Sequence, residues 1–261
     1  MNPFLTLHQL RRHLGLAPDD TADDDRLRAA LAAACDQIER LAGRRFSPLW
    51  AARRHDPAAP DELLLDADLL ELAALTGGDG VSMPLAGVRQ LPAMGPASVL
   101  RLARGQAWPG DWRESGVIVT GVWGWHPTWE TAWRASQDSA QTALAADATA
   151  LTVADAGGAD AAGETPRFQA GHLLRIGDEC LRVQAVDAAA DQLTVMRGAQ
   201  GTAAAAHPPG TAILVYQPPA EAAALALRWA AWLYHEPDSA AAPPGDLLAA
   251  AAGLRRVRVQ A

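Results

Sequence analysis

The chain contains no lysine, one asparagine and two cysteines in 261 residues, so all 22 basic side chains are arginines. This bias is typical of a GC-rich genome, and arginine-rich segments therefore carry little functional weight by themselves. No apolar run reaches the length of about 18 residues that suggests a membrane-spanning helix. The first residues place their arginines after a short apolar stretch, which is the reverse of a secretory signal peptide. We therefore expect a protein made in the cytoplasm, without a membrane segment.

The net charge is −8, from 22 basic and 30 acidic side chains. A broad nucleic-acid-binding surface normally shows a basic excess, so the charge argues against one. Hydrophobic residues make up 49% of the chain, which is enough for a sizeable core and excludes disorder over its whole length. The composition indicates a folded protein that repels nucleic acid phosphates rather than binding them.

The sequence lacks the known catalytic, phosphate-binding and metal-binding motifs that were sought in it. There is no phosphate-binding loop, no nucleophile elbow and no zinc-binding helix motif, and the seven histidines are not paired at ligand spacings. Cys35 and Cys180 form no metal motif and fit small core positions. Asp178 and Glu179 are adjacent at a predicted hairpin, where a strand would point them to opposite faces, so we expect a solvated turn rather than an acid–base pair. We expect no enzymatic activity, no metal and no cofactor.

Two helices are expected near the N-terminus. Thr6 and Gln9 have the spacing of a capping box, and Gly15 ends the helix that they begin. Apolar residues recur at intervals of three and four over 24–42 and predict a second helix with one apolar face. Gly43 follows as its C-cap.

The middle of the chain has the pattern of short strands. Gly, Pro and Asp interrupt apolar runs that predict strands at 63–65, 69–75, 81–83, 98–103 and 116–122. The run 69–75 is the least distinct, and a helical turn is its alternative. Residues 136–149 have the composition of a linker. Beyond them, five more strands are expected at 150–153, 173–176, 180–186, 193–196 and 212–216.

Helices return at 220–235 and 246–252, and the tail 254–261 alternates apolar and basic residues as an exposed strand would. These terminal helices need a partner for their apolar faces. We therefore predict an α+β fold in which N- and C-terminal helices form one helical bundle with a mixed β region. This discontinuous domain would span 1–135 and 218–261, with a small all-β domain inserted at 136–217.

Tryptophans and arginine pairs are the candidates for contacts with a partner. Many of the tryptophans between 108 and 133 lie beside Pro or Gly, which suits a core edge or a subunit interface, and carbohydrate stacking is the alternative. The arginine pairs suit solvated or intersubunit ion pairs, with contact to a phosphate backbone as the alternative. The candidate interface with another subunit or a partner protein comprises Arg44, Arg45, Arg53, Arg54, Trp123, Trp125, Trp129, Leu254, Arg255, Arg256, Val257 and Arg258.

The order of several segments resembles the tailed-phage head–tail connector (adaptor) family. These segments are LTLHQLRRHLGL, the acidic run PDDTADDD, RLRAALAAACDQIERLAGRRFSP, LLLDADLLELAALTGGDG and VIVTGVWGW. The resemblance covers residues 1–135 and continues in the helix at 220–235. The segment FQAGHLLRIGDECLRVQAVD is similar to a small β domain of longer phage structural proteins.

This resemblance implies a structural role at the neck of a virion assembled in the bacterial host cytoplasm. Such adaptors form a ring of about twelve copies beneath the portal protein, and a ring needs a heterologous interface. The ring extends the DNA channel without sequence-specific binding and docks the tail or a stopper protein. Terminal segments that contact the portal would here be residues 254–261. The alternatives are another neck or tail-completion protein, or a carbohydrate-binding accessory protein that uses the tryptophans.

Overall fold

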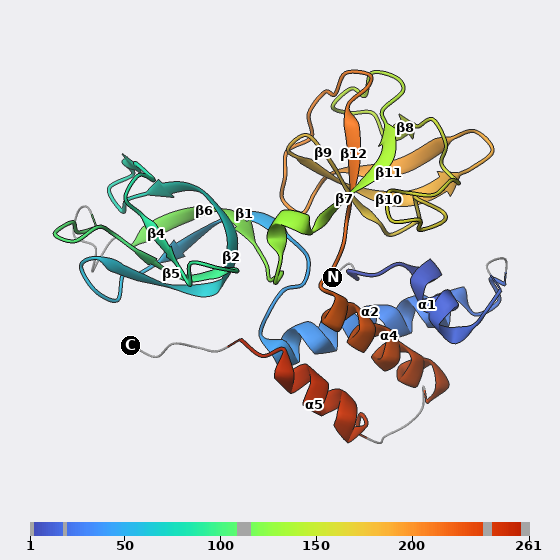
Figure 1. Ribbon diagram of the computed structural model, residues 1–261, viewed down its shortest axis with the longest axis horizontal. Coiled ribbons are helices and arrows are strands. Elements are labelled where there is room, and N and C mark those ends of the chain that lie inside the picture. The colour runs from blue at the N-terminus through green and yellow to red at the C-terminus, as the bar shows by residue number, and fades with distance from the viewer. Residues whose placement is uncertain (1–2, 18–19, 109–115, 237–241, 257–261) are drawn as a thin grey trace. The chain divides into compact units, whose positions relative to one another are not determined.

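The structure is a computed structural model that describes residues 3–17, 20–108, 116–236 and 242–256 (Figure 1). The chain divides into two compact units, one of residues 1–43 and 130–255 and the other of residues 44–129 and 256–261. The first unit contains helices and an antiparallel sheet, and the second contains another antiparallel sheet. The expected α+β class is therefore confirmed.

The first unit begins with two helices at the expected positions. α1 spans Leu7–Leu14 and α2 spans Asp24–Ala42. The Thr6 hydroxyl accepts from the Gln9 N–H, and the Gln9 side chain accepts from the Thr6 N–H, so the capping box forms as expected. Each helix ends at a glycine in the left-handed conformation, with φ +70° at Gly15 and +60° at Gly43.

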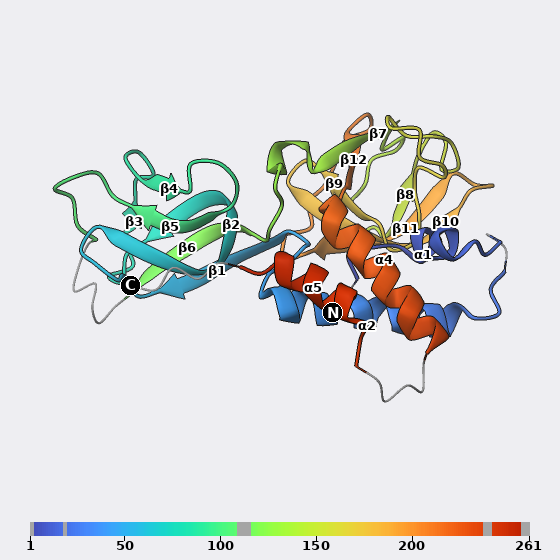
Figure 2. The same cartoon turned by 60° about the horizontal axis from the view of Figure 1, so that its bottom comes forward.

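Helices from the other end of the chain contact this pair. α4 spans Ala220–His235 and lies along α2, and α5 spans Gly245–Gly253 and contacts both (Figure 2). The Trp229 indole is 1% exposed and donates to Gln37 Oε1 at 2.9 Å. Burying one such side chain contributes roughly 1.5–3 kcal/mol, so the apolar faces of α2 and α4 stabilise each other.

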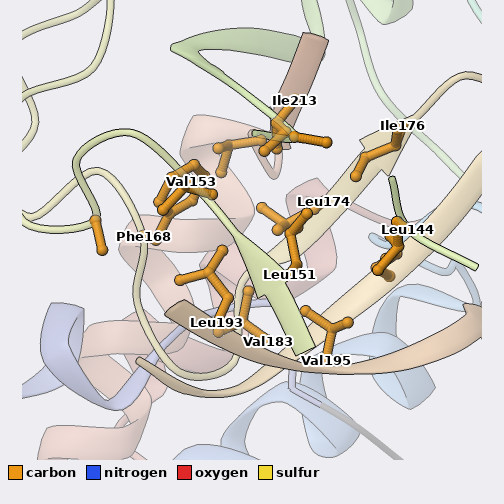
Figure 3. Packing of buried hydrophobic residues seen from close by; sticks show 14 residues of the cluster. Leu144, Leu151, Val153, Phe168, Leu174, Ile176, Val183, Leu193, Val195 and Ile213 are labelled. Carbon is orange, nitrogen blue, oxygen red and sulfur yellow. The ribbon is translucent and has the colours of Figure 1, made fainter. Parts of the chain in front are cut away.

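The sheet of the first unit is all antiparallel, in the order β7-β12-β9-β10-β11-β8. Its strands are β7 (Trp133–Ser139), β8 (Ala150–Thr152), β9 (Leu173–Ile176), β10 (Glu179–Asp187), β11 (Gln192–Ala199) and β12 (Ala212–Tyr216). The Gln141 N–H donates to the Thr152 carbonyl at 2.9 Å, which joins the chain after β7 to β8 at the opposite end of the order. The sheet thus curls around a core of aliphatic side chains and Phe168 (Figure 3).

One strand of this sheet was not expected. β7 covers residues 136–139, which have the composition of a linker, so that expectation is wrong there. The polar Ser136 is fully buried and donates its hydroxyl to the Ile213 carbonyl at 2.7 Å. Pairing with β12 makes this polar segment a strand, because tertiary context outweighs local β-propensity.

The sheet also packs against the start of the chain. The Thr6 hydroxyl donates to Gln169 Oε1 at 2.6 Å, and Arg182 donates to the Pro3 carbonyl at 3.3 Å. These contacts help place the sheet and the helices in one compact unit. The sequence predicts a domain of residues 1–135 and 218–261 with residues 136–217 inserted as a second domain. The compact unit groups the residues differently, and the predicted domain division stays a prediction.

The second unit has a sheet in the order β1-β6-β2-β5-β4, with β3 paired to β2. Its strands are β1 (Leu49–His55), β2 (Glu62–Thr76), β3 (Ser82–Met83), β4 (Arg89–Leu91), β5 (Ala97–Arg101) and β6 (Val117–Trp123), followed by the 3₁₀ helix η1 (Trp129–Thr131). The run 69–75 lies within β2 and is a strand rather than a helical turn. β1 and β4 were not expected.

Gly121 lies where two strands of this sheet leave no room for a side chain. A Cβ added to Gly121 on β6 would lie 2.0 Å from the Glu71 carbonyl oxygen on β2. The register between the two strands shifts at this point, so the backbones come together where the ladder is irregular.

Candidate interaction surface

The described residues hold no group of three His, Cys, Asp or Glu side chains placed to bind a metal ion. Within those ranges, no helix combines the length and apolarity that crossing a bilayer requires. Both cysteines are buried, as expected for small core residues. Burial raises the pKa of the Cys35 thiol to about 12 and that of Cys180 to about 11.

The adjacent acids at the β9–β10 turn have different environments. Asp178 is exposed as expected, but Glu179 is 1% exposed, so the expectation of a solvated turn is wrong for Glu179. Its carboxylate accepts from Arg197 Nε and Nη2, both at 2.8 Å, and lies 2.8 Å from His207 Nε2. Burial alone would raise the pKa of this carboxyl. Arg197 and backbone N–H donors outweigh burial and lower the pKa to about 2.

One face of the second sheet exposes apolar side chains. Trp50 on β1 is 40% exposed and Ile118 on β6 is 37% exposed. The register places Trp50 beside Val122 and Arg54 beside Ile118. We call this surface the β1–β6 face, and it comprises Trp50, Ala52, Arg54, Ile118, Thr120 and Val122. It ends at β1, which is the edge strand of the sheet.

The opposite side of β1 and β6 faces the core. Trp123 is fully buried and donates its indole N–H to the Ala51 carbonyl at 2.9 Å. The Arg53 guanidinium lies 4.8 Å from the Trp123 ring centroid, and Arg53 pairs with Asp66 at 3.3 Å. His55 stacks on the same ring, and burial lowers its pKa. Trp123 therefore offers no surface to a partner, although it was among the interface candidates.

Three of the candidate residues meet around Asp68, which is 6% exposed. Arg44 Nε lies 3.5 Å from Asp68 Oδ2, and Arg256 Nε lies 3.4 Å from Asp68 Oδ1. The Arg44 guanidinium also lies 4.7 Å from the Trp125 ring centroid. Burial raises the pKa of Asp68, and the two guanidinium groups act against that rise. We call the group of Asp68, Arg44 and Trp125 the Asp68 socket.

The remaining candidate residues are spread over other positions. The Arg45 carbonyl accepts from the Trp125 N–H at 2.7 Å, and Trp129 donates its indole N–H to Glu71 at 2.5 Å. Leu254 is buried and Arg255 is exposed. Val257 and Arg258 lie outside the described residues, as does most of the expected C-terminal strand.

Sequence reasoning missed Trp50, Ile118 and Asp68. Trp50 and Ile118 each lie in a short strand with alternating burial, but this alternation arises from strand pairing and is not visible as an apolar–polar alternation in the sequence. Nothing in the sequence around Asp68 distinguishes it from the exposed Asp66 two residues earlier.

No protein-family model and no curated protein matches the sequence. Two solved structures are similar to this chain. One is the neck of an empty gene transfer agent (GTA) particle, with a TM-score of 0.47 and 17% identity over 98% of this chain and 92% of that chain. The other is the virion of a native GTA particle, with a TM-score of 0.45, 18% identity and the same coverage.

Proposed function

We propose that the protein is a structural virion component, a head-to-tail adaptor that forms a ring of about twelve copies beneath the portal and docks the tail or a stopper. The family resemblance of residues 1–135 supports this role. At TM-scores below 0.5 the architecture shared with the solved structures is only partial. The proposal therefore rests on residues of this chain, and above all on the β1–β6 face.

The β1–β6 face suits a contact between copies. In a ring, one surface of each subunit meets a different surface of the next. Large aromatic rings and arginines are typical of protein interfaces, and Trp50 and Arg54 are both exposed on the same face of β1. An edge strand such as β1 also needs cover to avoid unwanted pairing, which a neighbouring copy would supply.

The charge distribution supports passage of DNA without binding. Residues 1–43 and 130–255 contain 12 arginines and 21 acidic residues, whereas residues 44–129 and 256–261 contain 10 and 9. The net negative charge therefore belongs to the first unit. We propose that this unit supplies the repulsive field along the channel, because a field of that sign keeps phosphates from adhering.

A carbohydrate-binding role is not favoured by the structure. Trp108 and Trp123, two members of the tryptophan cluster, are 2% and 0% exposed. Stacking on a sugar needs a free ring face, which these buried rings do not have. Another neck or tail-completion protein stays the alternative, and the position of the protein in particles separates the two roles.

The test is electron microscopy of lysates from a phage that lacks this gene. The adaptor role predicts DNA-filled or leaking heads beside free, complete tails, and normal whole particles would refute it. Complementation with Trp50→Glu is expected to leave heads and tails unjoined, while Met196→Glu, which changes an equally exposed side chain on β11, restores joining. If Trp50→Glu also restores joining, the β1–β6 face is not the contact.

A further inference from the structure

The β1–β6 face continues onto β2, the strand that pairs with the other side of β6. The register pairs three β2 residues with the three β6 residues of the face, namely Glu71 with Val122, Ala74 with Thr120 and Thr76 with Ile118. Paired residues of an antiparallel ladder point to the same side of the sheet, so these three side chains belong to the same surface. Glu71 is exposed, and Ala74 and Thr76 are half-buried. We call this surface of three strands the extended face.

The extended face consists of three rows that run across the strands. The first row is Trp50, Val122 and Glu71, the middle row is Ala52, Thr120 and Ala74, and the last row is Arg54, Ile118 and Thr76. Arg54 and Glu71 are its only charged members, and they lie at diagonally opposite corners. The exposed Trp50 ring occupies a third corner.

Neither corner charge is compensated by a neighbouring side chain. Glu71 Oε1 accepts from the uncharged Trp129 indole N–H at 2.5 Å. Within the ranges that the structure describes, neither Arg54 nor Glu71 forms an ion pair. A partner that fits this surface therefore brings an acid to one corner, a base to the opposite corner and uncharged side chains between them.

A second copy of the chain supplies this pattern. A two-fold axis in the plane of the extended face, along the line from Trp50 to Thr76, places Arg54 of each copy opposite Glu71 of the other. It also brings the two Trp50 rings close together, where an aromatic pair adds to the apolar contact. The strands of the two sheets then cross at roughly 90°, which is one of the two ways in which sheets pack face to face.

Other two-fold arrangements of the same face are less complementary. An axis along the strands places Glu71 opposite Trp50, and an axis perpendicular to the strands places it opposite Thr76. An axis along the line from Arg54 to Glu71 places each charge opposite its own copy, and like charges in contact are costly. Only the axis from Trp50 to Thr76 pairs both charges.

We propose that a second copy of this chain closes the extended face before assembly, in a two-fold dimer that pairs Arg54 of each copy with Glu71 of the other. Such an isologous contact joins two copies and stops, whereas a ring needs a heterologous contact. This inference deepens the proposed function and rests on it for the ring contact on the β1–β6 face. Because the dimer covers that face, it must dissociate before a copy can join the ring, and it thereby holds back premature ring assembly.

Sedimentation velocity of the purified full-length chain tests the dimer, at concentrations from about 1 μM to about 0.2 mM. Arg54→Glu or Glu71→Arg alone places like charges opposite each other at both ends of the contact, and each is expected to weaken dimerisation at least tenfold. The double variant Arg54→Glu/Glu71→Arg exchanges the signs of both pairs and should dimerise within about threefold of the unmodified chain. Arg89→Glu makes the same change of charge at an exposed position of β4, outside the extended face, and should have no effect.

Three outcomes overturn the proposal: a chain that stays monomeric at every concentration, a dimer that Arg54→Glu leaves intact, and a double variant that dimerises no better than the single variants. Circular dichroism shows whether each variant is folded. If Glu71→Arg alters the spectrum, Glu71→Gln replaces it, because its amide oxygen can still accept from Trp129 while the charge is gone. Glu71→Gln should weaken dimerisation about threefold, and dimerisation equal to that of the unmodified chain overturns the pairing.

Complementation of the phage that lacks this gene separates the dimer from the proposed function. If the chain is monomeric and Trp50→Glu leaves heads and tails unjoined, the dimer is overturned and the ring contact stands. If the charge reversals abolish a dimer but Trp50→Glu still restores joining, the dimer stands and the β1–β6 face is not the ring contact.

Discussion

Replacing Glu179 with glutamine is expected to destabilise the first unit, because this side chain is buried and paired. The Glu179 carboxylate accepts from Arg197, from the Gly198 N–H at 2.9 Å and from the Ala205 N–H at 3.1 Å. Arg197 is itself 7% exposed and also donates to loop carbonyls, among them Ala148 at 2.8 Å. Removing the negative charge leaves this guanidinium group buried without compensation.

The size of the effect follows from that geometry. Breaking a buried pair by neutralising one partner typically costs 3–5 kcal/mol, and glutamine retains one acceptor oxygen, so we expect a loss of about 3 kcal/mol. The folded pKa of about 2 lies below the ordinary value of 4.5. A lowered carboxyl pKa stabilises the fold fully above the unfolded pKa, and this stabilisation is lost as the pH falls toward the folded pKa. The stability of the unmodified protein should therefore decline between about pH 4.5 and pH 2.

Urea unfolding followed by circular dichroism at pH 7 and at several acidic pH values measures both effects. Glu179→Gln should lower the free energy of unfolding by about 3 kcal/mol at pH 7 and flatten its dependence on pH below 4.5. Asp178→Asn changes the exposed neighbour and should have a free energy of unfolding within about 0.5 kcal/mol of the unmodified protein. Equal stability of the two variants would refute the argument, because it would mean that the buried ion pair contributes nothing.

Three further predictions concern packing, thiol access and charge. Gly121→Ala should unfold the second unit or lower its melting temperature by many degrees, because the added Cβ meets the Glu71 carbonyl oxygen at 2.0 Å, whereas Gly245→Ala, with open space around it, should be neutral in thermal unfolding. Cys35 and Cys180 should not react with a thiol reagent at pH 8 until denaturant is added, because burial raises both pKa values to about 11 or above; rapid native labelling would contradict this. The chain should not bind double-stranded DNA in a fluorescence anisotropy titration at about 0.15 M salt, and a dissociation constant in the micromolar range or tighter would contradict the repulsive channel.

Local signals explain which elements could be predicted. The capping box at Thr6 and the glycines at 15 and 43 determine the conformation of neighbouring residues only. The start of α1 and the ends of α1 and α2 can therefore be predicted from the sequence. β7 has no such signal, because its polar residues become a strand only through pairing with β12, from which it is separated by about 75 residues. β1 was missed for the same reason, since its arginines and alanines gain their alternating burial only beside β6.

The candidate site was less predictable than the fold. Trp125, Arg44 and Arg256 were named from their residue types, but the partner that brings them together, Asp68, has no distinguishing sequence context. Glu179 was expected in solvent because Gly177 and Asp178 before it favour a turn. The turn forms, yet its last residue is the first residue of β10 and points toward Arg197, which lies 18 positions away.

The chain has arginine and no lysine at its basic positions, and several of these arginines contact a carboxylate and backbone carbonyls at the same time. Arg197, Arg167 and Arg256 each donate to backbone carbonyls of loops or strands while pairing with a carboxylate. An ammonium group has no planar fork and is more strongly hydrated, so lysine at these positions would lose several contacts at once. These arginines already have partners inside the chain, and they are poor candidates for binding a portal, a tail or DNA. The exposed Arg54 is the better candidate for contact with another protein, because its charge faces solvent in the chain by itself.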